Sequence, residues 1–244
     1  MSKNAHMNLT IIGGELSAQD SEFQEVRLFC EQQNLSITFE WIDGQYWLHS
    51  DGPKERPIGI QIDRELKRHE EYFKRSSIHN ELLARAVGVK SGIRPKILDL
   101  TGGLLGDTLL FLSFGCEVVT LERHPIISFL IKSALLNAKH TSLSRFTFLA
   151  QDASVFLAQK PPVDVIFFDP MFEDVNVKSS PKKEMRIFRG LVGSDKDAKQ
   201  VFEMARELRP RRLVVKRPRL SVTLVENPQI VFEGKATRYD VYLS

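Results

Sequence analysis

This sequence has few of the features that mark secreted, disulfide-bonded or membrane-spanning proteins. Its 244 residues include only two cysteines, Cys30 and Cys116, too few for a disulfide framework or a cysteine-based metal cluster. The apolar surroundings of Cys116 are typical of a buried, unreactive thiol. No apolar run approaches the roughly 20 residues that span a bilayer, and the first residues lack the apolar segment of a secretory signal. These absences predict a cytoplasmic protein.

Metal-binding patterns, internal repeats and low-complexity segments are missing too. The histidines have no metal-ligand spacing and no cysteine partners, so we interpret four of them as structural or surface residues: His69, His79, His124 and His140. The composition, with 42% hydrophobic and 27% charged residues, is ordinary for a globular chain. We therefore expect no bound metal.

The charge is distributed unevenly. Residues 1–63 carry 4 basic and 10 acidic side chains, a balance of −6, although the whole chain has a net charge of +3. Residues 64–96 carry 9 basic and 4 acidic side chains (+5), and residues 178–219 carry 14 and 5 (+9). Charged helices exposed to solvent explain many such runs, but prolines interrupt the segment 178–219. Two cationic segments around a near-neutral core favour a polyanionic partner, and nucleic acid is the obvious one.

The first sixty residues predict a small α+β subdomain, residues 1–63. Apolar segments separated by Gly and Asp-Gly turns predict strands at Leu9–Ile12, Ile37–Trp41, Tyr46–Leu48 and Ile58–Ile62, with a helix at Asp20–Gln33. Residues 64–80 then form a basic connector. It leads into the rest of a larger domain, residues 64–244.

From Lys96 the pattern changes to alternating apolar strands and helices. The expected strands are Ile97–Leu100, Glu117–Leu121, Phe146–Ala150, Val163–Phe168, Leu213–Lys216, Gln229–Phe232 and Thr237–Leu243. The expected helices between them are Asp107–Phe114, Pro125–Ala138, Ala153–Gln159 and Asp195–Leu208. This alternation predicts an α/β fold, in which a mostly parallel sheet has helices on both faces and ends in an antiparallel hairpin.

A glycine-rich loop joins the first of these strands to its helix, in the segment Asp99–Asp107. Glycines let a backbone pass close to a ligand, and the helix amino terminus presents N–H groups. The spacing lacks the full G-x-G-x-x-G dinucleotide fingerprint, which argues against a nicotinamide cofactor. The loop predicts a nucleotide-like ligand of another kind.

Acidic residues follow the next three strands. Glu122 is placed to accept hydrogen bonds from ribose hydroxyls, Asp152 precedes a segment that could contact an adenine edge, and Asp169 follows the fourth strand. Each of them alone is more often a helix cap or turn residue. Because ligands in open α/β sheets bind outside the carboxyl ends of strands, the four positions together favour a ligand site.

The fourth position reads Asp169-Pro170-Met171-Phe172 after an apolar strand. Asp-Pro is ordinary turn chemistry, but the combination also suits the binding of a flipped nucleobase. The carboxylate and backbone carbonyls could accept hydrogen bonds from an exocyclic amine, and Phe172 could stack on the base, although a core phenylalanine is the alternative. We predict that Asp169, Pro170 and Phe172 form the catalytic centre.

These positions resemble the class I S-adenosylmethionine (SAM)-dependent methyltransferases. Five segments further resemble the bacterial ribosomal RNA small subunit methyltransferase J family: 121–125, 169–172, 182–186, 191–193 and 214–218. The resemblance covers roughly Glu81 to Leu243. It implies a Rossmann-like seven-stranded sheet and SAM as the cofactor. It also implies methyl transfer to the N2 amine of a guanine in 16S ribosomal RNA.

The resemblance also implies roles for individual residues. The implied cofactor contacts are Asp99, Gly102, Gly106, Asp107, Glu122, Arg123, Asp152, Ala153, Ser154 and Asp169. Leu105 and Gly106 stand where related chains tend to carry Gly-Arg, and residues 74–80 lack a glycine run that we associate with the family.

Seven basic residues are predicted to contact RNA phosphates without reading sequence: Lys182, Lys183, Arg186, Arg189, Lys216, Arg217 and Arg219. Two other functions stay open at this point. One is amino methylation of a different target, such as a DNA base. The other is a non-catalytic RNA-binding assembly factor, which the acidic residues at 122 and 169 disfavour.

Overall fold

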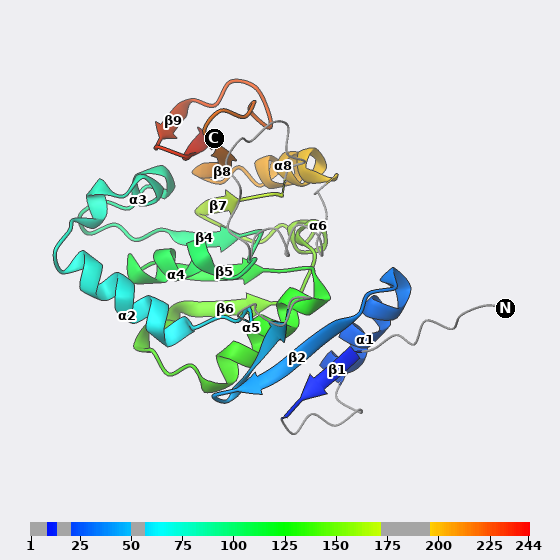
Figure 1. The fold of residues 1–244 in the computed structure, drawn as a ribbon. Helices are drawn as coiled ribbons and strands as arrows, with labels where there is room; N and C mark the ends of the chain where they lie inside the picture. The colour runs from blue at the N-terminus through cyan, green and yellow to red at the C-terminus, as the bar shows by residue number, and fades with distance from the viewer. Residues whose placement is uncertain (1–8, 14–20, 50–56, 172–195) are drawn as a thin grey trace. The chain divides into compact units, whose positions relative to one another are not determined.

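The computed structural model describes residues 9–13, 21–49, 57–171 and 196–244 (Figure 1). The chain divides into two compact units. One contains the described residues up to Ile62 together with 124–139, and the other contains residues 63–123 and the described residues from His140 to the carboxyl terminus.

The larger unit is built on a seven-stranded sheet. Its strands are β4 (Lys96–Asp99), β5 (Glu117–Leu121), β6 (Phe146–Leu149), β7 (Val165–Phe168), β8 (Arg212–Pro218), β9 (Ile230–Glu233) and β10 (Thr237–Tyr242). They lie in the order β6-β5-β4-β7-β8-β10-β9, and Figure 1 shows β8, β7, β4, β5 and β6 one below another. The first five strands are parallel, whereas β10 runs antiparallel to both β8 and β9. The predicted mostly parallel sheet with an antiparallel carboxyl-terminal hairpin is confirmed.

The central strand β7 is apolar throughout because both faces of the sheet are covered. All four residues of β7 are buried, as expected for a strand between two layers. Successive side chains point to opposite faces. Phe168 lies in a hydrophobic cluster on one face, and Phe167 contacts Phe111 of helix α4 (Gly106–Ser113) edge-on with ring centroids 5.0 Å apart.

Helices form the outer layers of this unit. They are α2 (Ile62–Phe73), α3 (Leu82–Val87), α4 (Gly106–Ser113), α6 (Ala153–Leu157) and α8 (Ala198–Glu207), with the 3-10 turns η1 (Ile78–Asn80) and η2 (Thr141–Arg145). α6 and α8 cover one face through a cluster that includes Leu157 and Phe202. Phe202 is fully buried and meets Tyr242 of β10 edge-on at 4.8 Å.

The smaller unit combines a short sheet with two helices. β1 (Leu9–Ile12) runs parallel to β2 (Ile37–Ile42), and β2 forms a hairpin with β3 (Gln45–His49). Asp43 and Gly44 form the predicted turn with φ values of 50° and 83°, the left-handed pair that a two-residue hairpin needs. The helices are α1 (Ser21–Gln33) and α5 (Pro125–Asn137).

Helix α5 belongs to this smaller unit although it lies between β5 and β6 in the sequence. Its Phe129 meets Phe39 of β2 at 4.9 Å, and its Ser133 Oγ accepts a hydrogen bond of 2.7 Å from the Tyr46 backbone. The amino-terminal residues therefore share their core with a helix distant in sequence. That residues 1–63 form a subdomain of their own stays a prediction.

One local prediction about residues 58–75 was wrong. Ile58 forms only an isolated bridge with Leu48, so the predicted strand Ile58–Ile62 is not present. The segment predicted as a basic connector contains most of helix α2, and its role as a connector stays a prediction. Ile62, Leu66 and His69 form its buried stripe at helical spacing, which the many charged residues between them had obscured.

Candidate active site

The carboxyl ends of β4, β5, β6, β7 and β8 meet at one edge of the sheet because these strands are parallel. Asp99 ends β4, and Asp169 follows β7 directly. Phe168 pairs in register with Val215, so Asp169 and Lys216 are the next residues along two neighbouring strands. This edge therefore gathers the predicted cofactor and catalytic positions that lie within the described residues.

The glycine-rich loop after β4 is held tightly against β5. The Gly102 N–H donates to the Leu121 carbonyl at 2.8 Å. A Cβ on Gly102 would lie 2.8 Å from Thr120 Cγ2 and 3.2 Å from the Leu121 oxygen. Only glycine fits this approach without a shift of the neighbouring strand.

The other end of the loop is open. Leu105, fully buried, has a left-handed φ of 62° just before α4. Gly106 begins α4, and a Cβ built there meets no atom of the described residues within 4 Å. The loop thus presents uncrowded backbone at a helix amino terminus, which suits the close approach of a ligand.

Asp99 is a buried carboxylate beneath this loop, with 1% of its surface exposed. Its Oδ1 accepts from the Thr101 N–H at 3.1 Å, and its Oδ2 accepts from the Thr108 hydroxyl at 2.6 Å. The Thr108 hydroxyl also lies 2.9 Å from that of Thr120. Burial raises the pKa of Asp99 to about 7, even though these two hydrogen bonds favour the ionised form.

Glu122 follows β5 and connects that strand to the glycine loop. Its Oε2 accepts a hydrogen bond of 2.8 Å from the Gly103 N–H, and its own N–H donates to the Leu149 carbonyl at 3.1 Å. The residue is 8% exposed. The Glu122 carboxylate is thus held against the glycine loop, and the Glu122 backbone is bonded to the end of β6.

A cluster of three charged side chains follows Glu122 at this edge: Arg123, Asp152 and Asp197. Arg123 binds both oxygens of Asp197 with its two terminal nitrogens, at 2.6 and 3.1 Å, and its Nη1 lies 3.2 Å from Asp152 Oδ2. The hydrogen bond with Arg123 lowers the pKa of Asp197. Nothing in the sequence pattern pointed to Asp197, because it precedes α8 and its contact is 74 residues from Arg123.

Asp152 also serves as the amino-terminal cap of α6. Its Oδ1 accepts from the Ser154 N–H at 2.8 Å and from the Ser154 hydroxyl at 2.5 Å. Burial would raise the pKa of Asp152, but the hydrogen bonds from Ser154 and Arg123 outweigh it and hold the pKa below its ordinary value. Ala153, the first helical residue, is buried in the core cluster.

Asp169 and Pro170 lie beside the glycine loop. The Asp169 N–H donates to the Thr101 hydroxyl at 2.8 Å, so the turn after β7 is fixed to the loop after β4. The Asp169 side chain is 37% exposed and Pro170 is buried. Thr101 was not among the predicted site residues, and its place between Asp99 and Asp169 shows how the two turns are connected.

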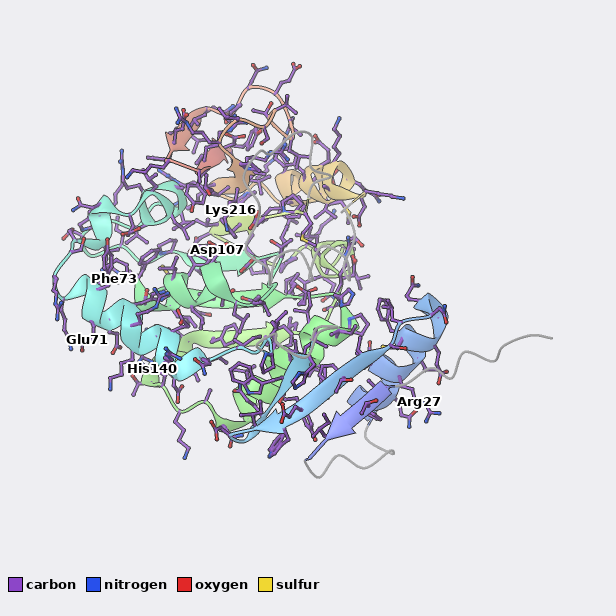
Figure 2. The ribbon with its side chains drawn as sticks, viewed as in Figure 1. Arg27, Glu71, Phe73, Asp107, His140 and Lys216 are labelled. Atoms are coloured by element: carbon purple, nitrogen blue, oxygen red, sulfur yellow. The ribbon has the colours of Figure 1, made fainter. Side chains whose placement is uncertain are left out.

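Lys216 joins two of the predicted site carboxylates, a contact that the sequence did not predict. Its Nζ lies 2.6 Å from Asp107 Oδ2 and 2.9 Å from Asp169 Oδ2. Asp107 belongs to the first turn of α4 and Lys216 to β8, as labelled in Figure 2. Burial alone would lower the pKa of Lys216, but the two carboxylates outweigh it and raise the pKa above its ordinary value.

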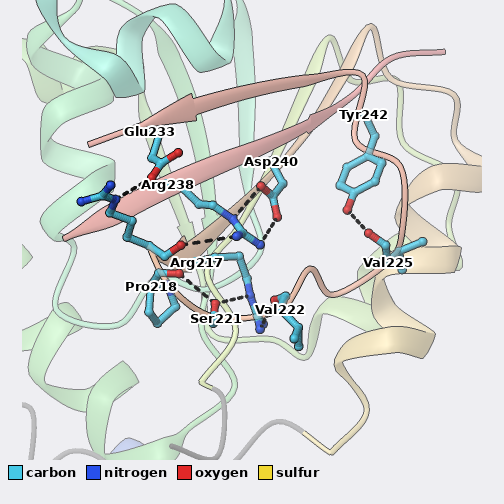
Figure 3. A network of polar contacts seen from close by, with 10 residues as sticks. Arg217, Pro218, Ser221, Val222, Val225, Glu233, Arg238, Asp240 and Tyr242 are labelled. Carbon is cyan, nitrogen blue, oxygen red and sulfur yellow. Dashed lines mark hydrogen bonds and ion pairs between the residues drawn. The ribbon is translucent and has the colours of Figure 1, made fainter. Parts of the chain in front are cut away.

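Arg217 points into a network of polar contacts rather than to the surface (Figure 3). It is 5% exposed, its Nη2 donates to the Val222 carbonyl at 2.6 Å, and its Nε donates to the Ser221 hydroxyl at 3.2 Å. It therefore anchors the loop after β8. Arg219, by contrast, is half-exposed and forms an ion pair of 2.5 Å with Glu233.

The remaining predicted site residues lie outside the described part of the chain: Phe172, Lys182, Lys183, Arg186 and Arg189. The binding and catalytic roles assigned from the sequence stay predictions for all site residues. Within the described residues, no group of three or more His, Cys, Asp or Glu side chains could hold a metal ion. The described helices also include none that is long and apolar enough to cross a membrane.

Comparison with known proteins identifies the family. A family model described as "Putative SAM-dependent methyltransferase" matches residues 23–244. A protein of Coxiella burnetii named ribosomal RNA small subunit methyltransferase J is 41% identical over 202 residues, with 80% of this chain and 79% of the relative covered. A protein of the same name from Laribacter hongkongensis is 40% identical over 244 residues and covers 94% of this chain and 86% of its own length.

A solved structure supports the fold. The crystal structure of a SAM-dependent methyltransferase from Neisseria gonorrhoeae has a TM-score of 0.64 and 23% identity, with 97% of this chain and 96% of that chain covered. The strand order and the antiparallel β10 agree with the fold expected from the resemblance. The chain belongs to the ribosomal RNA small subunit methyltransferase J family and is a SAM-dependent methyltransferase.

Proposed function

We propose that this chain transfers a methyl group from SAM to the exocyclic N2 amine of a guanosine in 16S ribosomal RNA. The name shared by its relatives supports ribosomal RNA as the substrate class. The observation that carries the proposal is the position of Asp169. Its partly exposed carboxylate follows a central strand, and its backbone N–H is bonded to Thr101 of the glycine loop.

The residues at this edge fit SAM as the bound group. The space above Gly106 admits a ligand against the start of α4, and the carboxylate of Glu122 stands at the end of β5, where ribose hydroxyls can be bound. Asp152 with Ala153 and Ser154 would bound the adenine side. All the charged side chains among the predicted cofactor contacts except Arg123 are acidic, which also matches a cofactor with a cationic sulfonium.

SAM supplies the methyl group as an electrophilic carbon on sulfur. The exocyclic amine of guanine is a poor nucleophile, because its lone pair is delocalised into the ring. In our proposal the Asp169 carboxylate and the Pro170 carbonyl accept hydrogen bonds from the two amine protons and aim the lone pair at the methyl carbon. Asp169 would then accept the proton that nitrogen loses as the new C–N bond forms and the bond between the methyl carbon and sulfur breaks, with a neutral thioether as the leaving group. Positioning and fixed charges supply most of the rate.

The basic residues position the RNA in this proposal. Arg219 is half-exposed and available to a phosphate if its ion pair with Glu233 opens. Phe172 would stack on the flipped base, a contact worth about 1–3 kcal/mol. Lys182, Lys183, Arg186 and Arg189 would contact phosphates, with an affinity that falls as salt rises. A cytoplasmic enzyme would meet this substrate on ribosomes or their precursors.

The test is methylation of small ribosomal subunits and of free 16S ribosomal RNA with labelled SAM, followed by mass mapping of the modified nucleotide. Asp169→Ala should lower the methylation rate by about 10²–10³-fold, with RNA affinity nearly unchanged. Asp164→Ala is the matched control, because Asp164 precedes the same strand at its opposite end and accepts a hydrogen bond from the Lys96 N–H.

Asp164→Ala should therefore keep the wild-type rate. A label on adenine or cytosine, or on DNA but not RNA, would replace the proposed substrate by another amino-bearing base. Full activity of Asp169→Ala would remove this carboxylate from the mechanism.

A further inference from the structure

We infer that Lys216 is a positioning residue of the methyl transfer: it holds Asp107 and Asp169 together at the reacting edge of the sheet. The inference rests on the proposed function and deepens it. It also replaces the sequence-based expectation that Lys216 contacts an RNA phosphate. The geometry of its ammonium group points to a role inside the site.

The contacts are short and come from three different elements. Lys216 extends from β8, Asp107 from the first turn of α4, and Asp169 from the turn after β7. One nitrogen lies 2.6 Å from the first carboxylate and 2.9 Å from the second. A single side chain therefore links the helix proposed to hold the cofactor to the carboxylate proposed to hold the amine.

The surroundings make this link stronger than a surface ion pair. The exposed fractions of the three side chains are 25% for Lys216, 19% for Asp107 and 37% for Asp169. Charged pairs that are mostly removed from water are screened less than exposed ones. Without the ammonium group, the two carboxylates would repel each other, and the ionic link between them would be lost.

The described groups that face this cluster are mainly acidic or neutral. Asp99 lies beneath it on β4, and the Coulomb effects of Asp107 and Asp169 help to raise the pKa of Asp99. Tyr239 of β10 pairs in register with Lys216, and burial together with Asp107 raises its pKa, so the phenol stays neutral. Glu81 and Arg217 are further charged groups close enough to interact with Tyr239 and Asp169 respectively.

Lys216 has two effects in this arrangement. It fixes the orientation of Asp169 toward the amine, and its positive charge favours the ionised carboxylate that can accept the amine protons. Removing that charge would favour the protonated form of Asp169 instead. The methylation rate should then fall on the acid side of its pH profile at a higher pH than in the wild type.

The experiment compares Lys216→Met and Lys216→Arg with the wild type under single-turnover conditions at saturating SAM and ribosomal RNA. Lys216→Met should lower the rate by about 10²-fold and move the acid limb of its pH profile upward by roughly 1–2 pH units. The apparent affinity for RNA should change less than about twofold. Lys216→Arg keeps the charge and should restore part of the rate and the original acid limb.

Lys199→Met is the control for loss of one lysine charge, since Lys199 is exposed on α8. It should show the wild-type rate and profile. If Lys216→Met proves too unstable to assay, the Lys216→Met/Asp107→Asn double variant removes one charge of each sign. Its rate should be low, and its acid limb should still move upward.

A second readout needs neither cofactor nor RNA. The Asp169 carboxyl carbon can be followed by NMR through a pH titration, with its signal assigned by loss in Asp169→Asn. Its midpoint should rise in Lys216→Met. An unchanged midpoint, or an unchanged rate combined with weaker RNA binding and a lower salt dependence, would overturn the inference and restore the phosphate contact. Failure of the wild-type protein to methylate ribosomal RNA would instead count against the proposed function alone.

Discussion

Replacing Asp99 by asparagine should change how the stability of this protein depends on pH. Asp99 is 1% exposed, and its pKa is raised from 3.8 to about 7 in the folded state. The folded protein therefore holds this proton more tightly than the unfolded chain does. The stability contributed by protonated Asp99 is complete below pH 4, declines as the pH rises from about 4 to about 7, and is then lost.

The size of the effect follows from the two pKa values. One unit of difference corresponds to about 1.4 kcal/mol, so ionisation of Asp99 disfavours the folded state by on the order of 4 kcal/mol at high pH. Roughly 3 kcal/mol of that loss falls between pH 5 and pH 8. An asparagine side chain cannot ionise, so the Asp99→Asn variant should lack this decline.

The neighbouring hydroxyl groups can accommodate the amide. The Thr101 N–H can donate to the amide oxygen as it does to Asp99 Oδ1. Either hydroxyl of the Thr108–Thr120 pair can be the donor, so Thr108 can accept from the new NH₂ group and donate to Thr120. The replacement should therefore leave the fold intact.

The assay is urea unfolding of cofactor-free protein at pH 5 and pH 8. The loss of unfolding free energy between these two pH values should be about 3 kcal/mol smaller in Asp99→Asn than in the wild type. Asp164→Asn is the charge-matched control and should behave as the wild type. Equal losses in Asp99→Asn and the wild type would refute the reasoning, since Asp99 would then have no raised pKa.

Two further pairs of variants test the loop and the basic residues. Gly102→Ala should destabilise the fold by about 1–3 kcal/mol, because its Cβ would lie 2.8 Å from Thr120 Cγ2. Gly106→Ala should change stability by less than about 0.5 kcal/mol but weaken SAM binding, measured by calorimetry, about tenfold or more. Equal SAM affinity in Gly106→Ala and the wild type would place the cofactor elsewhere. Arg217→Met should destabilise by about 1–3 kcal/mol, since the Val222 carbonyl loses its donor. Arg219→Met should change stability by less than about 1 kcal/mol. It should also reduce the slope of the logarithm of RNA affinity against the logarithm of salt concentration by about one. Both arginine variants are compared by urea unfolding, and a stable Arg217→Met would contradict the anchoring role.

Much of the fold could be predicted because its local patterns are strong. The apolar run that ends at Phe168 is continuous because β7 is buried on both faces. The Pro125 start of α5 and the Asp43-Gly44 turn carry local signals of their own. The local patterns of residues 58–75 are weaker. A short alternating run at 58–62 resembles a strand, and the many charged residues of α2 obscure the helical spacing of its buried residues.

The sequence by itself determined the alternation of strands and helices, the family resemblance and the acidic residues that follow four strands, because each depends on neighbours along the chain. Only the tertiary structure decided what the basic residues of β8 contact. Lys216 and Arg217 are adjacent in a strand, so their side chains leave on opposite faces. One meets Asp107 and Asp169, and the other anchors the following loop. Their partners Asp107 and Asp169 come from other parts of the chain, and only the packed sheet brings those charges within contact distance.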